Sequence, residues 1–203
     1  MQINNRVVSA ESAPPAKHVD HEDGCDSANT QWKEKLRNGT TVTIRRLRAD
    51  DVELERRFIE ELSPQSRRFR FLGEIKSPSP SLLKQLTQLD STHDIAYVAL
   101  IFADGADKRV IGVSRFSARP DGLTCECAVT VSDAWHNQGL ATILMRHLID
   151  AARRRGIECM YSVDAAGNDA MRELAEHFGF TRKPDPNDAT QVLHTLDLKA
   201  ATV

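Results

Sequence analysis

The pattern of apolar and polar residues separates a polar leading segment from a patterned remainder. Residues 1–38 mix Pro, Ser, Asp and Glu with almost no apolar periodicity, which predicts a flexible N-terminal tail. Residues 41–47 read TVTIRRL, an alternation rich in β-branched side chains that predicts a first strand. We therefore expect one folded domain over residues 39–203 behind the tail.

Three helices are expected after this strand. Apolar residues recur at helical spacing over 52–62, and Asp50 or Asp51 can cap the start of that helix. A proline in the first turn suits a short helix over 64–72. A third apolar stripe over 82–89 follows a Pro-rich break.

The chain then changes from helical to strand-like patterning. Three strands are expected in close succession, over 95–102, 110–117 and 123–131, separated by turn-forming Asp, Pro and Gly. Such short connections predict an antiparallel meander.

The last third alternates helices and strands. A helix is expected over 140–155, a strand over 157–163, a helix over 169–178 and a strand over 191–198. A strand, helix and strand in this order imply a parallel pair beside the last strand of the meander. The predicted fold class is therefore α/β, with a mixed sheet and flanking helices.

Charge and composition exclude several function classes. The 203 residues carry 27 Lys and Arg against 29 Asp and Glu, so a net charge of −2 gives no overall attraction to nucleic acid or to an anionic membrane. Apolar runs such as 95–102 are far shorter than the ~20 residues of a membrane-spanning helix. The opening residues lack the apolar core of a secretory signal. We expect a cytoplasmic protein with neither nucleic acid nor membrane as partner, its oligomeric state left open.

Histidine and cysteine spacing predicts no metal site. The residues His18, His21, Asp23 and Cys25 lie close together in the tail, but their spacing matches no closed zinc pattern. Four cysteines in a chain of this length do not make a disulfide scaffold, and reduced thiols are expected.

The segment after the meander carries the clearest chemical signal. Residues 136–141 read HNQGLA and lie between a predicted strand and a predicted helix. Backbone N–H groups at a helix start lack intrahelical partners and can bind a phosphate or diphosphate. Gly139 allows close approach of a ligand, and Ala141 keeps the next turn free of bulk. The alternative is a tight strand-to-helix connection without a ligand.

This loop and a later segment resemble the GCN5-related N-acetyltransferase (GNAT) family. The family's acetyl-CoA loop reads Gln/Arg-x-x-Gly-x-Gly/Ala, and here His136 stands at its first position. Residues 168–180, NDAMRELAEHFGF, resemble its second signature, an Asn-initiated helix that ends in Gly-Phe. The resemblance extends over residues 40–198 and implies a GNAT-type mixed sheet with a strand-helix-strand unit that binds acetyl-CoA.

Within this family the chain is most similar to the acetyltransferase domain of bacterial Pat-type protein lysine acetyltransferases. Three segments carry the similarity: VTIRRLRADD at 42–51, LSPQSRRFRF at 62–71 and CECAVTV at 125–131. This resemblance implies direct transfer of acetyl from acetyl-CoA to an amine, with a protein lysine favoured as acceptor. A small-molecule amine acceptor and a non-catalytic acyl-CoA sensor are the alternatives.

The resemblance also implies roles for individual residues. Glu126 corresponds to the family's proposed general base. Pantetheine is expected to contact the main chain of Val129, Thr130 and Val131, and Asn168 is expected to contact the pantetheine arm. The diphosphate is expected to bind the loop and helix start, His136, Asn137, Gln138, Gly139, Leu140, Ala141 and Thr142. Ala175 stands where many family members have a tyrosine as general acid, so the general acid is left unassigned.

Elementary chemistry supports a base at Glu126. A lysine amine has a pKa of ~10.4, so its proton must be accepted before it can attack a thioester. Alternation along the strand places Glu126 on one sheet face, and Cys125 and Cys127 on the other, where we expect packing instead of metal binding or covalent catalysis. The alternative for Glu126 is a solvated position or an ion pair with Arg115.

The basic segment around residue 68 has three interpretations. Arg67, Arg68 and Arg70 alternate with phenylalanines. This pattern suits a helix with its arginines in water and its phenylalanines in the core, or a small nucleic-acid patch. In an acetyltransferase the same helix could border the acceptor groove and favour an acidic substrate surface.

Overall fold

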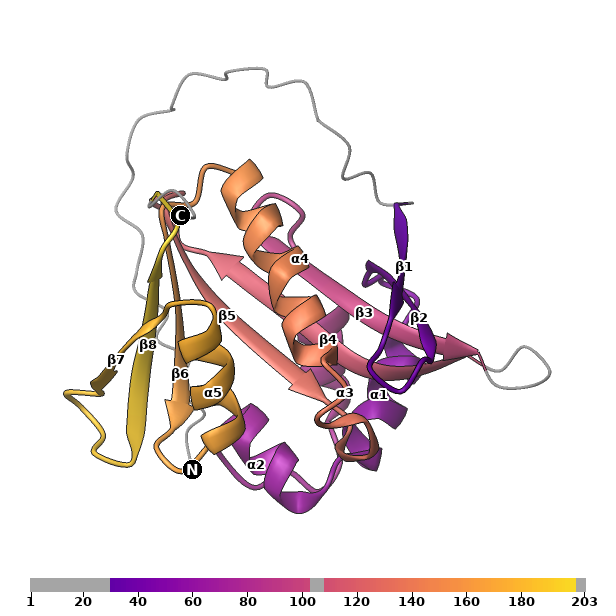
Figure 1. Ribbon diagram of the computed structural model, residues 1–203. Coiled ribbons are helices and arrows are strands. Elements are labelled where there is room, and N and C mark those ends of the chain that lie inside the picture. Colours follow the sequence, from indigo (N-terminus) through magenta and orange to yellow (C-terminus); the bar gives the residue numbers. More distant parts are fainter. Residues whose placement is uncertain (1–29, 103–107, 200–203) are drawn as a thin grey trace.

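One sheet of eight strands runs through the part of the chain that the structure describes, residues 30–102 and 108–199 of this computed structural model (Figure 1). The strands are β1 Gln31–Lys35, β2 Thr41–Arg46, β3 Asp94–Phe102, β4 Lys108–Ala118, β5 Thr124–Val131, β6 Cys159–Ala165, β7 Thr181–Pro184 and β8 Gln191–Asp197. Their order across the sheet is β1-β2-β3-β4-β5-β6-β8-β7. Every neighbouring pair is antiparallel except β5 and β6, which are parallel.

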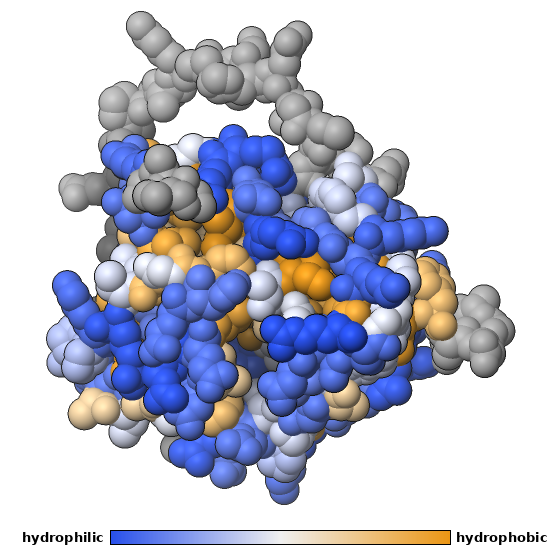
Figure 2. Space-filling model, viewed as in Figure 1, coloured by the Kyte–Doolittle hydropathy of each residue, from blue (hydrophilic) through white to orange (hydrophobic). Residues whose placement is uncertain are grey.

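Helices cover both faces of this sheet. The helices are α1 Val52–Glu61, α2 Pro64–Phe71, α3 Pro80–Thr87, α4 Leu140–Arg154 and α5 Asp169–His177, with a 3₁₀ turn at Asp133–Trp135 before α4. Helices α1 and α3 bury apolar residues against β3 and β4 on one face, whereas α4 and α5 build the larger core on the other. Figure 2, in the same view, shows mainly hydrophilic residues over the α4 side, with hydrophobic ones in smaller patches between them.

The α/β class and the mixed sheet predicted from the sequence are confirmed. The meander is β3, β4 and β5, and α4 joins the parallel pair β5 and β6. Cys125 and Cys127 face the core that α4 covers, as the alternation in β5 predicted.

The predicted tail does not extend to residue 38, because β1 pairs with β2 along its whole length. The indole of Trp32 packs edge-on against Tyr97, with ring centroids 5.7 Å apart, and also contacts His147. Leu36 is buried in the core. The sequence pattern did not predict this strand because QWKEK is rich in charged residues. These are tolerated because β1 is an edge strand that exposes every second side chain. Residues 1–29, including His18, His21, Asp23 and Cys25, lie outside the described residues.

Strand β7 was not predicted from the sequence either. It consists of four exposed residues, TRKP, that pair with β8 at the other edge of the sheet. Neither hydrophobic alternation nor β-branched enrichment marks so short an edge strand, and only the pairing with β8 defines it.

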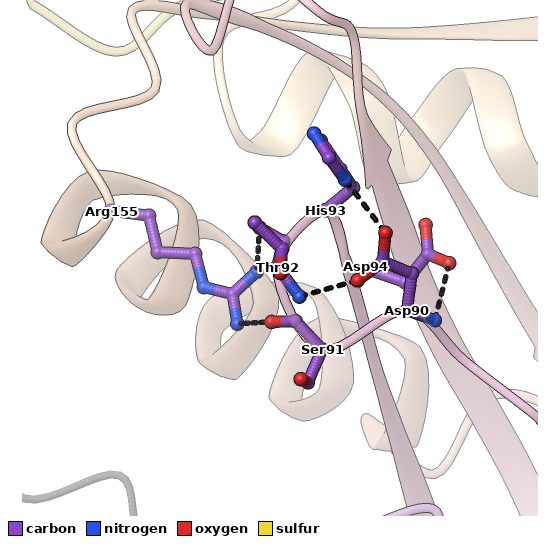
Figure 3. Close-up of polar contacts among 6 residues, drawn as sticks. All are labelled: Asp90, Ser91, Thr92, His93, Asp94 and Arg155. Carbon is purple, nitrogen blue, oxygen red and sulfur yellow. Dashed lines mark hydrogen bonds and ion pairs between the residues drawn. The ribbon is translucent and has the colours of Figure 1, made fainter. Parts of the chain in front are cut away.

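The carboxyl end of α4 is fastened to the turn before β3 (Figure 3). The Arg155 guanidinium donates hydrogen bonds to the carbonyl oxygens of Ser91 at 2.8 Å and Thr92 at 3.4 Å. Asp90 stabilises the same turn by accepting from the Thr92 N–H at 2.9 Å and pairing with the His93 ring at 2.9 Å. The helix that precedes β6 is therefore held in place at this end.

Two absences hold for the described ranges. No helix within them has the length and apolar character needed to cross a bilayer. Their His, Cys, Asp and Glu side chains form no group of three or more that could hold a metal ion.

A buried ion pair joins β2 to the start of α1. Both carboxylate oxygens of Asp51 accept hydrogen bonds from the Arg45 guanidinium, at 2.6 and 2.7 Å, and one also accepts from the Arg48 N–H. Asp51 occupies the N-cap position that the sequence predicted, but its side chain makes no capping hydrogen bond. Although burial opposes ionisation, the bonds from Arg45 and Arg48 hold the pKa of Asp51 below its usual value.

Asp51→Asn tests this pair through pH. A carboxyl whose pKa is lowered by folding stabilises the native state above its unfolded pKa of ~3.9, and this contribution is lost as pH falls through the folded pKa. We expect Asp51→Asn to lower the free energy of unfolding by about 3 kcal/mol at neutral pH, because it leaves Arg45 buried without its partner. Urea unfolding should show the difference from wild type shrinking below pH ~4. Asp50→Asn, at the exposed neighbour, is the control, and a difference independent of pH would contradict the assignment.

Candidate functional site

Strands β5 and β6 part after a short paired segment, and this opening defines the site. The parallel register joins Thr124 to Cys159, Cys125 to Met160 and Glu126 to Tyr161, and ends there. Beyond Glu126, β5 still pairs with β4, and β6 still pairs with β8. Figure 1 shows the two strands diverging toward the end of the sheet where α4 begins. The facing backbone edges of residues 127–131 and 162–165 thus lack a strand partner between them.

The loop after β5 brings the start of α4 to this opening. Asn137 and Gly139 both adopt left-handed backbone conformations, with φ of 61° and 82°. Asn and Gly are the residues that tolerate this region best. The first helical hydrogen bond runs from the Ile143 N–H to the Gly139 carbonyl, so the N–H groups just before it have no partner in the helix.

Gly139 leaves space for a ligand at this helix start. Apart from its two chain neighbours, the described part of the chain brings only the Arg37 side chain near a Cβ atom placed there, at 3.7 Å from Nε and 3.8 Å from Cγ. The partial positive charge of the helix N-terminus and these N–H groups suit an anionic group such as a diphosphate. Within the predicted loop, His136 and Asn137 are exposed and Gly139 is part-buried, whereas the Leu140 side chain is buried in the core.

The loop is held by contacts that the sequence did not reveal. The Nε2 atom of His136 lies 3.0 Å from the Val131 carbonyl oxygen, so the ring folds back on the end of β5. Asp133 accepts hydrogen bonds from Ser63 and from the Ser66 hydroxyl at the start of α2. Burial works against ionisation, but these bonds hold the pKa of Asp133 below its usual range.

The residues predicted to contact pantetheine lie on the two sides of the opening. The meander side is formed by the end of β5, which consists of Val129, Thr130 and Val131. Asn168 lies on the opposite side, three residues beyond the end of β6, as the N-cap of α5. Its Oδ1 accepts from the Met171 N–H at 3.2 Å, in agreement with the predicted Asn-initiated helix. The structure therefore places the predicted pantetheine-contacting residues along both sides of one opening.

Glu126 lies where the two strands part and is exposed. Its Oε2 accepts a hydrogen bond from the Tyr161 hydroxyl at 3.3 Å. That hydroxyl in turn accepts from the Arg119 guanidinium, at 2.9 Å from Nη2 and 3.1 Å from Nε. Burial raises the pKa of Tyr161, although the Arg119 hydrogen bond opposes this, so the phenol is neutral at pH 7 and can donate to Glu126.

The hydrogen bond between Tyr161 and Glu126 was not predicted from the sequence. The signal available was the parallel pairing of the two strands, but the register that makes these residues direct partners depends on tertiary structure. Tyr97, the other tyrosine, is fully buried in the core.

Arg115 does not bond to Glu126, which removes one alternative for that carboxylate. Its guanidinium pairs instead with the buried Glu55 at 3.1 Å and reaches the Leu86 carbonyl at 3.3 Å. Burial raises the pKa of Glu55, against the opposing effect of Arg115. Burial and the neighbouring Arg115 lower the pKa of Arg70 to about 10, which leaves it a cation at neutral pH on the Glu126 side of the sheet.

The remaining candidates for chemistry are inert. Burial raises the pKa of Cys125 to about 12 and that of Cys127 well above its usual value, so both are packed thiols at neutral pH. Ala175, at the position of the family's usual tyrosine, is buried in the α5 core.

Comparisons with known proteins agree with this geometry. The model of the acetyltransferase (GNAT) family matches residues 58–180. The chain is 52% identical over 167 residues to Acetyltransferase PA5475 of Pseudomonas aeruginosa. This match covers 82% of this chain and 89% of that protein.

Solved structures show the same fold. The GNAT domain of S. lividans PAT superposes with a TM-score of 0.74 at 25% identity, over 82% of this chain and 96% of that one. A cAMP-binding acyltransferase from Mycobacterium smegmatis has a TM-score of 0.57 at 24% identity, over 83% of this chain but 47% of that one. The chain therefore belongs to the GNAT family of acetyltransferases, and acetyl-CoA is its co-substrate.

Proposed function

We propose that this protein transfers the acetyl group of acetyl-CoA directly to a lysine side chain of a protein, with Glu126 as general base. The observation that carries the proposal is the exposed carboxylate of Glu126 at the point where β5 and β6 part. The similarity to Pat-type enzymes in sequence, and to the GNAT domain of S. lividans PAT in structure, supports a protein lysine as acceptor.

In this proposal the cofactor lies along the opening between β5 and β6. The main chain of Val129–Val131 pairs with the pantetheine arm, and Asn168 contacts the arm from the other side. The diphosphate binds the loop and helix start, residues 136–142. Left-handed Gly139 and the unpartnered N–H groups of the first turn support this placement.

The chemistry requires a proton acceptor and little else. Glu126, directly or through water, takes a proton from the lysine ammonium, and the neutral amine attacks the thioester carbonyl carbon. A C–N bond forms and the C–S bond breaks, the attached nitrogen gives up its second proton to water, and the sulfur leaves as a thiolate. A thiol with a pKa of ~8.5 is a good leaving group, so its departure needs only water as proton source. No covalent acyl-enzyme is involved, consistent with the inert thiols of Cys125 and Cys127.

Helix α2 supports an acidic acceptor surface. Arg70 is close enough to Glu126 for the two charges to interact, and Arg68 is exposed on the same helix. Arg67 instead donates to the Glu60 carbonyl at the end of α1 at 3.0 Å. Arg68 is thus exposed to solvent, and the part-buried Arg70 adds a positive charge near Glu126, so this helix can attract acidic residues around a target lysine.

The acceptor class is tested with labelled acetyl-CoA, supplied in parallel to a cell lysate and to a panel of small amines. Label transferred to protein supports the proposal. Transfer to a small amine alone would assign the alternative acceptor class, and binding of acetyl-CoA without transfer to any acceptor would favour the sensor.

Gly139→Glu tests the cofactor loop. It introduces bulk and negative charge where the diphosphate is placed, so the rise in melting temperature caused by acetyl-CoA should be lost. Gly156→Glu is the matched control, because Gly156 is also left-handed, with φ of 72°, and no described atom beyond its chain neighbours lies within 4 Å of a Cβ there. An unchanged shift in Gly139→Glu would remove this loop from the cofactor site.

Glu126→Gln tests the general base. The amide cannot accept the proton, so we expect transfer to fall by ~10²–10⁴-fold while acetyl-CoA affinity is retained. Glu173→Gln, at an exposed carboxylate on α5, should behave like wild type. Nearly normal transfer by Glu126→Gln would leave Glu126 as a solvated residue of the sheet.

Tyr161→Phe asks whether a general acid is present beside the base. Its hydrogen bond to Glu126 is long, at 3.3 Å, and a thiolate can leave unaided. We therefore expect kcat within about tenfold of wild type, below the usual contribution of a positioned acid. Tyr97→Phe, in the core, should be similar. A thousandfold loss in Tyr161→Phe with acetyl-CoA affinity intact would identify Tyr161 as the acid.

A further inference from the structure

The turn between β1 and β2 lies against the loop that precedes α4. The Arg37 N–H donates to the Gln138 carbonyl at 3.1 Å. Within the turn, the Leu36 N–H bonds to the Thr40 carbonyl and the Gly39 N–H to the Leu36 carbonyl, both at 2.9 Å. Main-chain hydrogen bonds therefore fix Arg37 beside the loop, whatever side chain stands at position 37.

The hairpin is also fastened to the middle of α4. The carboxylate of Glu34 accepts from Arg146 at 2.9 Å and pairs with the His147 ring at 3.0 Å. Trp32 stacks obliquely on the same ring, with centroids 4.7 Å apart. The β1–β2 hairpin and α4 thus form one unit, so position 37 is held at a constant place relative to the helix start.

The side chain of Arg37 lies over Gly139 and forms only a weak hydrogen bond within the described residues. It contributes the only described atoms near a Cβ at Gly139, at 3.7 and 3.8 Å. Its Nη1 donates to the Asn137 carbonyl at 3.5 Å, the outer limit for a hydrogen bond. No described carboxylate pairs with this exposed guanidinium. Most of its donors are free for another acceptor.

The loop itself supplies no cationic side chain for a diphosphate. Residues 132–142 read SDAWHNQGLAT, which contains neither Lys nor Arg, and its Asp133 accepts hydrogen bonds from Ser63 and Ser66. His136 is turned back onto the Val131 carbonyl. A diphosphate bound here would gain backbone N–H groups from α4 but would need its positive side chain from elsewhere.

We propose that Arg37 binds the diphosphate of acetyl-CoA, completing the anion site from the β1–β2 turn. The inference rests on the placement of the diphosphate at residues 136–142 in the proposed function. A guanidinium forms paired hydrogen bonds with phosphate oxygens and remains charged at any physiological pH. Arg37 is a binding residue in this scheme and takes no part in proton transfer.

Calorimetric titration of three ligands tests the proposal. Coenzyme A carries a diphosphate and a 3′-phosphate, dephospho-coenzyme A carries only the diphosphate, and S-acetylpantetheine carries neither. We expect Arg37→Gln to raise the Kd of coenzyme A and of dephospho-coenzyme A by about tenfold each, as for a lost charge-assisted hydrogen bond, and to leave S-acetylpantetheine unchanged. Lys35→Gln, at an exposed cation of the same hairpin, should change none of the three.

Arg37→Lys separates charge from a packing role. It keeps the positive charge but loses the paired hydrogen bonds, so it should bind coenzyme A more weakly than wild type and more tightly than Arg37→Gln. Raising salt from about 50 to about 300 mM should weaken Arg37→Gln less than wild type. The proposal would be overturned if Arg37→Lys and Arg37→Gln lost the same affinity for coenzyme A at both salt concentrations. It would also be overturned if Arg37→Gln lost affinity for coenzyme A alone, or lost affinity for S-acetylpantetheine as well. If wild-type protein binds S-acetylpantetheine but neither coenzyme A nor dephospho-coenzyme A, the diphosphate site itself is contradicted. If Arg37→Gln binds coenzyme A and dephospho-coenzyme A as tightly as wild type does, only the role of Arg37 is contradicted.

Discussion

The parting of β5 and β6 after three residue pairs is the constraint on which the site depends. A strand edge inside a sheet carries N–H and C=O groups that need partners, and leaving them unpaired is costly. The opening persists because each strand is held from its outer side, β5 by β4 and β6 by β8. An extended, amide-containing ligand arm can take the place of the missing strand pairs, and the same feature places Glu126 at the narrow end of the opening.

The other elements fix what lies around this opening. Helix α4 is fastened at its carboxyl end by Arg155 and in its middle by Glu34 of the β1–β2 hairpin. Asp133 ties the intervening loop to the start of α2. The helix start can therefore offer its N–H groups to a ligand from a fixed position, which lowers the entropy lost on binding.

Most of the fold, and the core of the candidate site, could be predicted from the sequence. Helical stripes and alternating strands are local signals, whereas the roles predicted for the HNQGLA loop and Glu126 came mainly from the resemblance to the GNAT family, with support from the chemistry of a helix start and of a carboxylate base. Strand β1 was missed because three of its five residues are charged, so its stability comes from Trp32 and the pairing with β2 instead of a local pattern. The contacts of Tyr161 with Glu126 and of Arg37 with Gly139 join residues 35 and about 100 positions apart, which no single-sequence pattern encodes.

Amide hydrogen exchange, read residue by residue with and without acetyl-CoA, tests the central claim most directly. If the cofactor lies between β5 and β6, the amides at the end of β5 and in the first turn of α4 gain protection, while those of the fully paired strands β3 and β4 change little. Protection that appears elsewhere, with Val129–Val131 and residues 139–142 unchanged, would contradict a cofactor site in this opening.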